Sequence, residues 1–373
     1  MRNRVIGAVA LAVFAVGLGW HLSRGKARSK ENAPALQAAR AAAQNPTSRR
    51  ANSIHRGANA SVNETDTSTN SAFKRLYAGD KELFAVPAES IRAYLESNGF
   101  SAESLLAAFQ VASNRDYLLS AATNHPHDPR VQFAVLLNDA LPLQRAEWLA
   151  RFKQDAPDNA LPNYIAARDA FKAQHLEEAL REVNAAAAKP HYRDYLVENV
   201  HALQELYLAD GRSPAEAKLA GMAAALMPHL GMLRDLAKDE MTLQKRYAAA
   251  GDMQSADAMA ANVAHLGQQL STGEGAFTLL SQLIGVSIEV GALKEYAADA
   301  QPAFLSTTAQ DRLAQLQQQR QSIRDGAKLL DGWMTTATER DVMAYFDRMK
   351  LYGESGALAW LQNRMAAANR STE

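Results

Sequence analysis

The sequence contains no cysteine in its 373 residues, so disulfide bonds, thiolate metal ligands and cysteine nucleophiles contribute nothing to its fold or chemistry. It also lacks an excess of charge, because 40 Lys and Arg residues balance 40 Asp and Glu residues. General nucleic-acid binding depends on a net positive field, which a balanced chain does not produce. We therefore expect no nucleic-acid partner.

Motifs that would indicate catalysis are lacking too. The sequence has no phosphate-binding glycine loop and no dinucleotide-binding fingerprint. The segment GVSIE at residues 285–289 lacks the closing glycine of a nucleophile elbow and lies in an apolar run typical of a helix. The acidic pairs Glu177-Glu178 and Asp239-Glu240 fit charges in a first turn or on a solvent-facing surface. We therefore expect no catalytic residue and no cofactor.

The nine histidines form one sequence cluster, His125-Pro126-His127-Asp128. No His-x-x-x-His pair and no carboxylate-bearing zinc motif accompany it. A proline-bounded turn with a short polar side chain is instead typical of the start of a helix. We therefore expect no metal site.

The N-terminus has the pattern of a membrane-targeting segment. A short basic lead precedes an apolar run over residues 5–20, and further basic residues follow from Arg24 onward. Extended to residue 22, the run has about 18 residues, or roughly 27 Å of helix, close to the thickness of a hydrocarbon core. We expect residues 1–22 to form a hydrophobic membrane anchor, with membrane contact through residues 5–22. A cleaved secretory signal is the alternative.

The position of this segment also bears on cellular location. An apolar run so near the N-terminus, with a short basic lead, is the usual form of a signal anchor that exports the chain after it. We therefore expect a single-pass protein of a bacterial inner membrane with its body in the periplasm. The positive-inside rule favours a cytoplasmic-facing body, because the flank after the apolar run is the more basic one. Both orientations stay open.

Residues 23–72 are rich in Ala, Asn, Ser, Thr and Arg and have few large apolar side chains. Such a composition does not bury enough surface to fold, so we expect a disordered basic and polar linker. Eight basic residues and one acid lie between Arg24 and Arg56, a pattern compatible with contact to anionic lipids. A solvated linker with a few stop-transfer charges is the alternative.

From about residue 73 the apolar residues recur at helical spacing, and no segment alternates as a strand does. The pattern predicts an all-α body, divided into a helical repeat domain over 73–298 and a C-terminal helical cap over 299–373. Within the cap, Pro302 and Gly332-Trp333 predict breaks. A first helix begins near Pro87 and ends at Asn98-Gly99. A second helix is expected to open at Ser101, and further helices are expected at about 114–123, 129–140, 142–155, 160–173, 176–188, 191–209, 214–227, 230–250, 252–270, 275–298, 309–331, 338–351 and 354–369.

Three prolines divide part of this body at regular intervals. Pro126, Pro157 and Pro190 lie 31 and 33 residues apart, which is the period of a helix-turn-helix repeat. Each interval has room for two helices and a short turn. Because each hairpin exposes an apolar face that only a neighbour can cover, the pattern predicts an α-solenoid of stacked helical hairpins.

Residues 160–191 resemble the tetratricopeptide repeat family. The segment LEEAL at residues 176–180 resembles the start of the family's second helix, and Ala167 and Ala179 occupy positions where the family places small residues. The sequence departs from the family at Ala170, where an aromatic residue is usual. A second hairpin, from Leu243 to Leu270, keeps the family's register but lacks the closing proline, and the resemblance as a whole covers about a third of the chain. It implies helical hairpins and a concave groove that binds a protein or peptide partner.

The resemblance also implies which residues line that groove. Tyr164, Arg168 and Lys172 are spaced four residues apart and so form one stripe on a helix. His201 and Glu205 occupy the corresponding stripe one hairpin later. The two cations of the first stripe favour an acidic partner or a C-terminal carboxylate. Ordinary solvated or inter-hairpin contacts are the alternative for each of these residues.

These patterns together predict a membrane-tethered helical-repeat scaffold that binds a protein or peptide partner without catalysis. A structural envelope spacer or self-assembling subunit, associating through its C-terminal helices, is one alternative. A cell-envelope enzyme with a helical superhelix body is another. That last reading requires a cleft with paired carboxylates of shifted pKa.

Overall fold

The computed structural model describes residues 81–334 and 336–370. Within these ranges the chain is α-helical and has no β-strand, only an isolated bridge between Asn159 and His191. The expectation of an all-α body is therefore confirmed. None of the helices in this part of the chain is long and apolar enough to cross a membrane. The expected anchor and linker, residues 1–22 and 23–72, lie outside the described residues.

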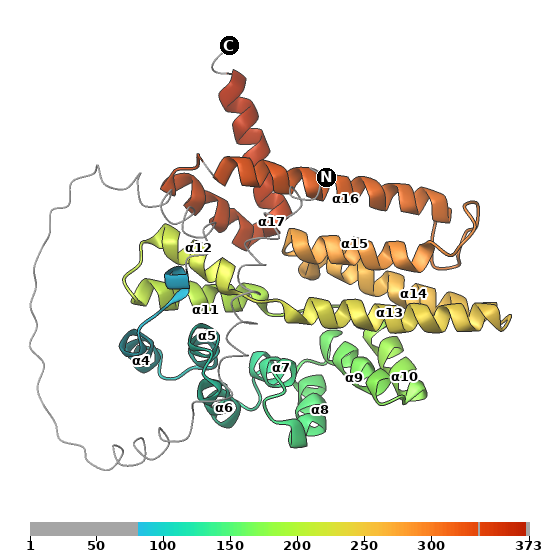
Figure 1. Ribbon diagram of the computed structural model, residues 1–373, viewed down its shortest axis with the longest axis horizontal. Helices are drawn as coiled ribbons and strands as arrows, with labels where there is room; N and C mark the ends of the chain where they lie inside the picture. Colours follow the sequence, from blue (N-terminus) through green and yellow to red (C-terminus); the bar gives the residue numbers. More distant parts are fainter. Residues whose placement is uncertain (1–80, 335, 371–373) are drawn as a thin grey trace, which may run out of the picture.

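The helices lengthen along the chain, from about three turns at the start to much longer elements from α13 onward (Figure 1). In chain order they are α4 (Ala88–Ser97), α5 (Ala102–Ala112), α6 (Arg115–Asn124), α7 (Pro129–Leu137), α8 (Arg145–Asp155), α9 (Leu161–Lys172), α10 (Leu176–Ala187), α11 (Leu196–Ala209), α12 (Pro214–Ala224), α13 (Pro228–Ala249), α14 (Met253–Ser271), α15 (Leu279–Leu293), α16 (Ala309–Met334) and α17 (Glu339–Arg370). Short 3₁₀ turns are η3 (Lys81–Phe84), η4 (Pro142–Gln144) and η5 (Gly273–Ala276).

The helices are arranged in three layers (Figure 1). The short helices α4 to α10 form a row along one side. The next helices cover this row, since α11 packs against α4 and α5, α13 against α9, and α14 against α10. On the opposite side α16 packs on α15, and α17 packs on α12 and α16. One hydrophobic core, from Leu83 to Leu361, joins the three layers.

The spaced prolines separate helical hairpins, but the hairpins do not continue as a simple stack. α7 pairs with α8, and α9 pairs with α10. Beyond the third proline, α11 pairs with α12 and returns to pack on α4 and α5. The connection from α10 to α11 is held at the start of α9, because Ala160 N donates to His191 O at 2.8 Å and Asn159 Nδ2 donates to Arg193 O at 2.9 Å. The expected start of a helix at residue 191 is therefore wrong, and α11 begins five residues later.

Polar side chains start the helices where the sequence suggests. At α7, Asp128 Oδ1 accepts a hydrogen bond from Arg130 N at 2.9 Å, and Pro129 occupies the first turn. At α5, Ser101 Oγ accepts from Ser104 N at 3.3 Å. These bonds satisfy N–H groups that have no partner within the helix. The prediction that the His125–Asp128 cluster starts a helix is confirmed.

The small residues of the expected repeat lie at a helix contact. Ala167 on α9 and Ala179 on α10 are both fully buried, and these two helices pack closely along their length. A larger side chain at either position has no free space to occupy. The two alanines therefore pack as the sequence suggests.

The C-terminal helices follow the sequence in part. α16 ends at Met334, one residue after the break expected at Gly332-Trp333, and α17 begins at Glu339. α17 bends at Gly353, whose φ of 69° lies in the left-handed region that favours glycine. Next to this bend, Glu354 N donates to Phe277 O at 2.8 Å and Glu354 Oε2 accepts from Leu279 N at 2.6 Å. These bonds dock α17 at the start of α15.

Candidate functional site

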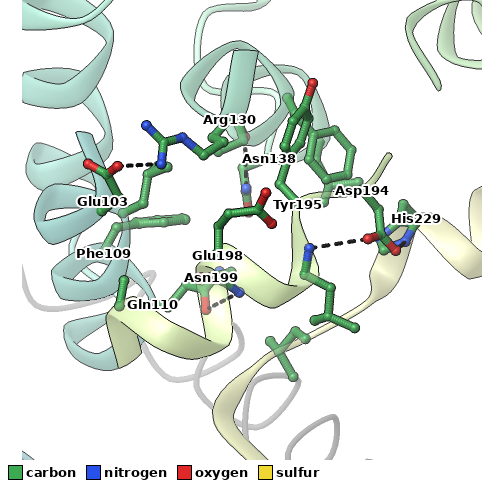
Figure 2. A pocket seen from close by; sticks show the side chains of 17 residues that line it. Glu103, Phe109, Gln110, Arg130, Asn138, Asp194, Tyr195, Glu198, Asn199 and His229 are labelled. Carbon is green, nitrogen blue, oxygen red and sulfur yellow. Dashed lines mark hydrogen bonds and ion pairs between the residues drawn. The ribbon is translucent and has the colours of Figure 1, made fainter. Parts of the chain in front are cut away.

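A pocket lies between the first and second layers, where α5, α7 and α11 meet above the start of α13 (Figure 2). We call it the interlayer pocket. Its free volume is about 70 Å³. One water needs roughly 10–15 Å³ in this measure, so the space holds about five water-sized groups. The pocket is lined by Glu103, Leu106, Phe109, Gln110, Arg130, Phe133, Ala134, Leu137, Asn138, Asp194, Tyr195, Leu196, Glu198, Asn199, Ala202, Leu226 and His229.

The base of the interlayer pocket is aromatic and apolar. Phe133 on α7 is buried and meets the ring of His229 edge-on, with 5.5 Å between centroids. The Tyr195 ring lies 6.4 Å from Phe133. Leu106 and Phe109 of α5 are only partly buried, so part of their apolar surface is open to the pocket. A ligand with an apolar portion gains by covering this surface.

Arg130 on α7 lies at one side of the pocket but is already engaged. Its guanidinium pairs with Glu103 of α5 and with Asp128, whose Oδ1 lies 2.9 Å from Arg130 Nε. Burial alone raises the pKa of both carboxyls, yet hydrogen bonds from Arg130 and from backbone N–H groups hold each pKa below its ordinary value. Both carboxylates are therefore ionised partners of Arg130, which leaves this cation little capacity for a ligand.

A histidine and an aspartate form the inner end of the pocket. Asp194 lies just before α11, where Tyr195 adopts a left-handed φ of 58°. Asp194 accepts a hydrogen bond from Leu196 N at 3.2 Å, and its Oδ2 lies 3.0 Å from His229 Nε2 (Figure 2). His229 is only 2% exposed, and within the described residues its Nδ1 has no hydrogen-bond partner.

Glu198 stands out among the polar groups of the pocket. Its side chain comes from the first turn of α11 and points into the space between α5 and α7 (Figure 2). The neighbouring Asn199 donates from Nδ2 to Gln110 Oε1 at 3.1 Å and so closes one side. Glu198 itself is exposed, and its carboxylate forms no hydrogen bond or ion pair with the described part of the chain. It is the acid of this pocket that is free to meet a ligand.

The interlayer pocket combines an apolar base with a few polar side chains. Its lining includes no serine, threonine, cysteine or lysine that could act as a nucleophile. The hydroxyl of Tyr195 accepts a hydrogen bond from Asn159 Nδ2 at 3.2 Å. No group of three or more metal-ligating side chains occurs in residues 81–334 and 336–370. An apolar base with a few convergent polar groups is typical of a site that recognises a side chain or a small ligand.

The first stripe expected to line a groove is mostly covered by other helices. Tyr164 is 1% exposed, and its hydroxyl lies 2.7 Å from Gln269 Oε1 on α14. Arg168 Nη1 lies 3.0 Å from Asp239 Oδ2 on α13. Lys172 alone is exposed. The stripe therefore does not present three free side chains, because α13 packs on α9 and Tyr164 is bonded to Gln269 of α14.

The second expected stripe faces a different neighbour. His201 and Glu205 are exposed on α11 and lie 3.2 Å apart between Nε2 and Oε1. His201 Nδ1 also lies 3.2 Å from Lys350 Nζ on α17. Near His201 there is a small hollow of about 20 Å³. The two stripes thus meet different helices, α13 and α14 in one case and α17 in the other.

One acidic residue is placed differently from the expectation. Glu240 was expected on a solvent-facing surface but is 0% exposed, so that prediction is wrong. The cause is tertiary: α13 contacts α9, α14 and α15, which cover it on several sides. Glu177, in contrast, is exposed on α10 as expected.

Sequence reasoning did not find the interlayer pocket, because its residues come from four helices far apart in the chain. Some local signals were present. Glu103 and Asp128 were recognisable as charges at helix starts, and Glu198 stands in the first turn of α11. No local signal shows that these starts meet. Comparisons with known protein families, curated proteins and solved structures find no significant match to the chain.

Proposed function

We propose that this chain is a helical-repeat scaffold, similar to tetratricopeptide proteins, that binds a protein or peptide partner and performs no catalysis. The interlayer pocket is its docking site for one side chain of that partner. In this proposal residues 5–22 tether the scaffold to a bacterial inner membrane, with the body in the periplasm and the basic linker near anionic lipids. Loss of the chain from carbonate-washed membranes after deletion of residues 1–22 tests the tether.

The observation that carries this proposal is the combination of size and lining in the interlayer pocket. Room for about five water-sized groups fits one long side chain. The exposed rim residues Asn138 and Glu198 leave the pocket open to a partner. An apolar base with polar groups around it is also the arrangement that anchors a central side chain at protein interfaces.

The test is site-specific photocrosslinking in the native cell. A benzoylphenylalanine residue at Asn138, on the rim of the pocket, is compared with the same residue at Glu177 on α10. Both positions are exposed, and both variants keep the pocket's buried residues. We expect a polypeptide adduct from position 138 that position 177 does not give, with matched melting curves for the two proteins.

Two results would count against the proposal. Equal adducts from both positions would mean that capture does not depend on the pocket. Absence of any polypeptide adduct at position 138 would remove the pocket as a docking site. If the adduct is a second copy of this chain, the result supports the alternative that the protein is a self-assembling subunit.

A further inference from the structure

The interlayer pocket carries more negative than positive charge. Its lining includes three carboxylates, Glu103, Asp194 and Glu198, and one guanidinium, Arg130. Most of these charged groups are already paired within the chain. Arg130 is bound by Glu103 and Asp128, and Asp194 accepts from Leu196 N and lies against His229. What is left over for a ligand is therefore mainly the carboxylate of Glu198.

A second group in the pocket also offers an acceptor. His229 is almost fully buried, and its Nδ1 has no hydrogen-bond partner within the described residues. When Nε2 carries the proton toward Asp194, Nδ1 is a lone-pair acceptor. Because an unpaired buried acceptor costs free energy, a donor that reaches it is favoured. A negatively charged ligand would be repelled by the unpaired carboxylate of Glu198.

The apolar surface of the pocket sets the shape of the ligand. Leu106, Phe109 and Leu137 are partly buried and give the pocket an apolar lining. A lysine or arginine side chain has an apolar stem that packs on such a lining while its charged end reaches a polar group. A free carboxylate at the rim then forms a charge-assisted hydrogen bond to that end.

We infer that the interlayer pocket takes one lysine or arginine side chain of a partner polypeptide, with its stem on the α5 and α7 side chains and its cationic end on Glu198. This inference rests on the proposed scaffold function and adds the charge of the partner. The partner inferred here is basic, whereas the expectation from Arg168 and Lys172 in the sequence was an acidic partner. Arg168 already pairs with Asp239, so that stripe has one free cation, Lys172, among the three residues.

A peptide array probed with the full chain in detergent micelles tests this inference. The peptides share randomised apolar-rich flanks and carry Lys, Arg, Gln or Glu at one fixed central position. The proteins are wild type, Glu198→Gln and the control Glu177→Gln, which removes an exposed acid that forms no pair within the described residues. Melting curves confirm that the three are equally folded.

We expect wild type to prefer peptides with central Lys or Arg over those with Gln, and to reject those with Glu. Glu198→Gln should lower the ratio of Lys to Gln binding about tenfold, because one charge-assisted hydrogen bond is lost. Glu177→Gln should leave the ratio unchanged.

The outcomes separate this inference from the scaffold proposal. If binding does not depend on the central residue, and the ratio of Lys to Gln binding is the same for wild type and Glu198→Gln, the pocket does not select a cationic side chain. The scaffold proposal would still stand. If free Nα-acetyl-lysine amide competes as strongly as the peptides do, the pocket recognises a small cationic molecule and not a side chain of a polypeptide. Absence of binding to every peptide would overturn this inference and count against the scaffold as well.

Discussion

At the scale of single residues, Glu240 is the acid most strongly altered by its surroundings. It is fully buried in α13, and within the described residues neither carboxylate oxygen has a hydrogen-bond partner. Burial, with a smaller effect of the neighbouring Asp239 charge, raises the pKa of Glu240 from 4.5 to about 8. The side chain is therefore protonated in the folded protein at neutral pH. The unfolded chain, in contrast, ionises near the ordinary value.

This difference predicts how stability depends on pH. Because the folded-state pKa is the higher one, the stability that protonated Glu240 confers is complete below about pH 4.5 and is lost as pH rises through about 8. The free energy of unfolding should fall by up to about 1.4 kcal/mol per pH unit between these values. Glu240→Gln should flatten this slope in urea titrations, whereas Glu177→Gln should not. Equal slopes for wild type and Glu240→Gln would contradict the account.

Residue-level expectations succeeded where the cause is local. Asp128 starts α7 because its side chain bonds an N–H two residues later, which a short sequence motif reveals. Tyr164 and Glu240 are buried for a different reason, since α13 comes from much later in the chain and packs on α9, and α14 packs on α13 and α10. Helical spacing shows which residues share a face, but not which distant helix covers it.

At the scale of elements, the tightest contact is between α14 and α15. Gly267 faces Gly285 across it, and a Cβ at Gly267 would lie 2.7 Å from Gly285 O and 2.9 Å from Glu289 N. Both atoms are backbone atoms, so neither moves without a shift of α15. Gly267→Ala should therefore lower the free energy of unfolding by about 1–3 kcal/mol, the usual effect of overpacking.

A second helical glycine is a matched control for this change. Gly231 lies near the start of α13, and a Cβ there would meet no atom within 4 Å. Alanine favours a helix over glycine by about 1 kcal/mol, so Gly231→Ala should be neutral or stabilising. Urea denaturation measures both variants. Equal effects of the two substitutions would mean that helix propensity, and not the α14 to α15 contact, determines the result.

The sequence also predicts most element boundaries, because helix starts and stops depend on nearby residues. α9 and α10 lie within one or two residues of their expected ranges. The failure at the start of α11 has a tertiary cause. Residues 191–195 form no helix because backbone groups at His191 and Arg193 bond to residues near the start of α9.

At the scale of the whole molecule, the return of α11 to α4 and α5 creates the interlayer pocket. Regular stacking of hairpins would have placed α11 next to α10, away from Glu103 and Arg130. The proline spacing predicts hairpins but does not predict this return. Residues that line the pocket therefore lie from Glu103 to His229 in the sequence. The layered arrangement is what gives Glu198 its position opposite α5 and α7 (Figure 2).

The absence of cysteine from the sequence allows a direct test of whether a partner occupies this pocket. A single cysteine at Asn138, on the rim, is compared with one at Glu177, and the rate of maleimide labelling is measured in native-cell extract and in purified full chain. We predict slower labelling of Asn138→Cys in extract than in purified protein, with no such difference for Glu177→Cys. Equal slowing at both positions, or none at either, would contradict the claim that the interlayer pocket is the docking site.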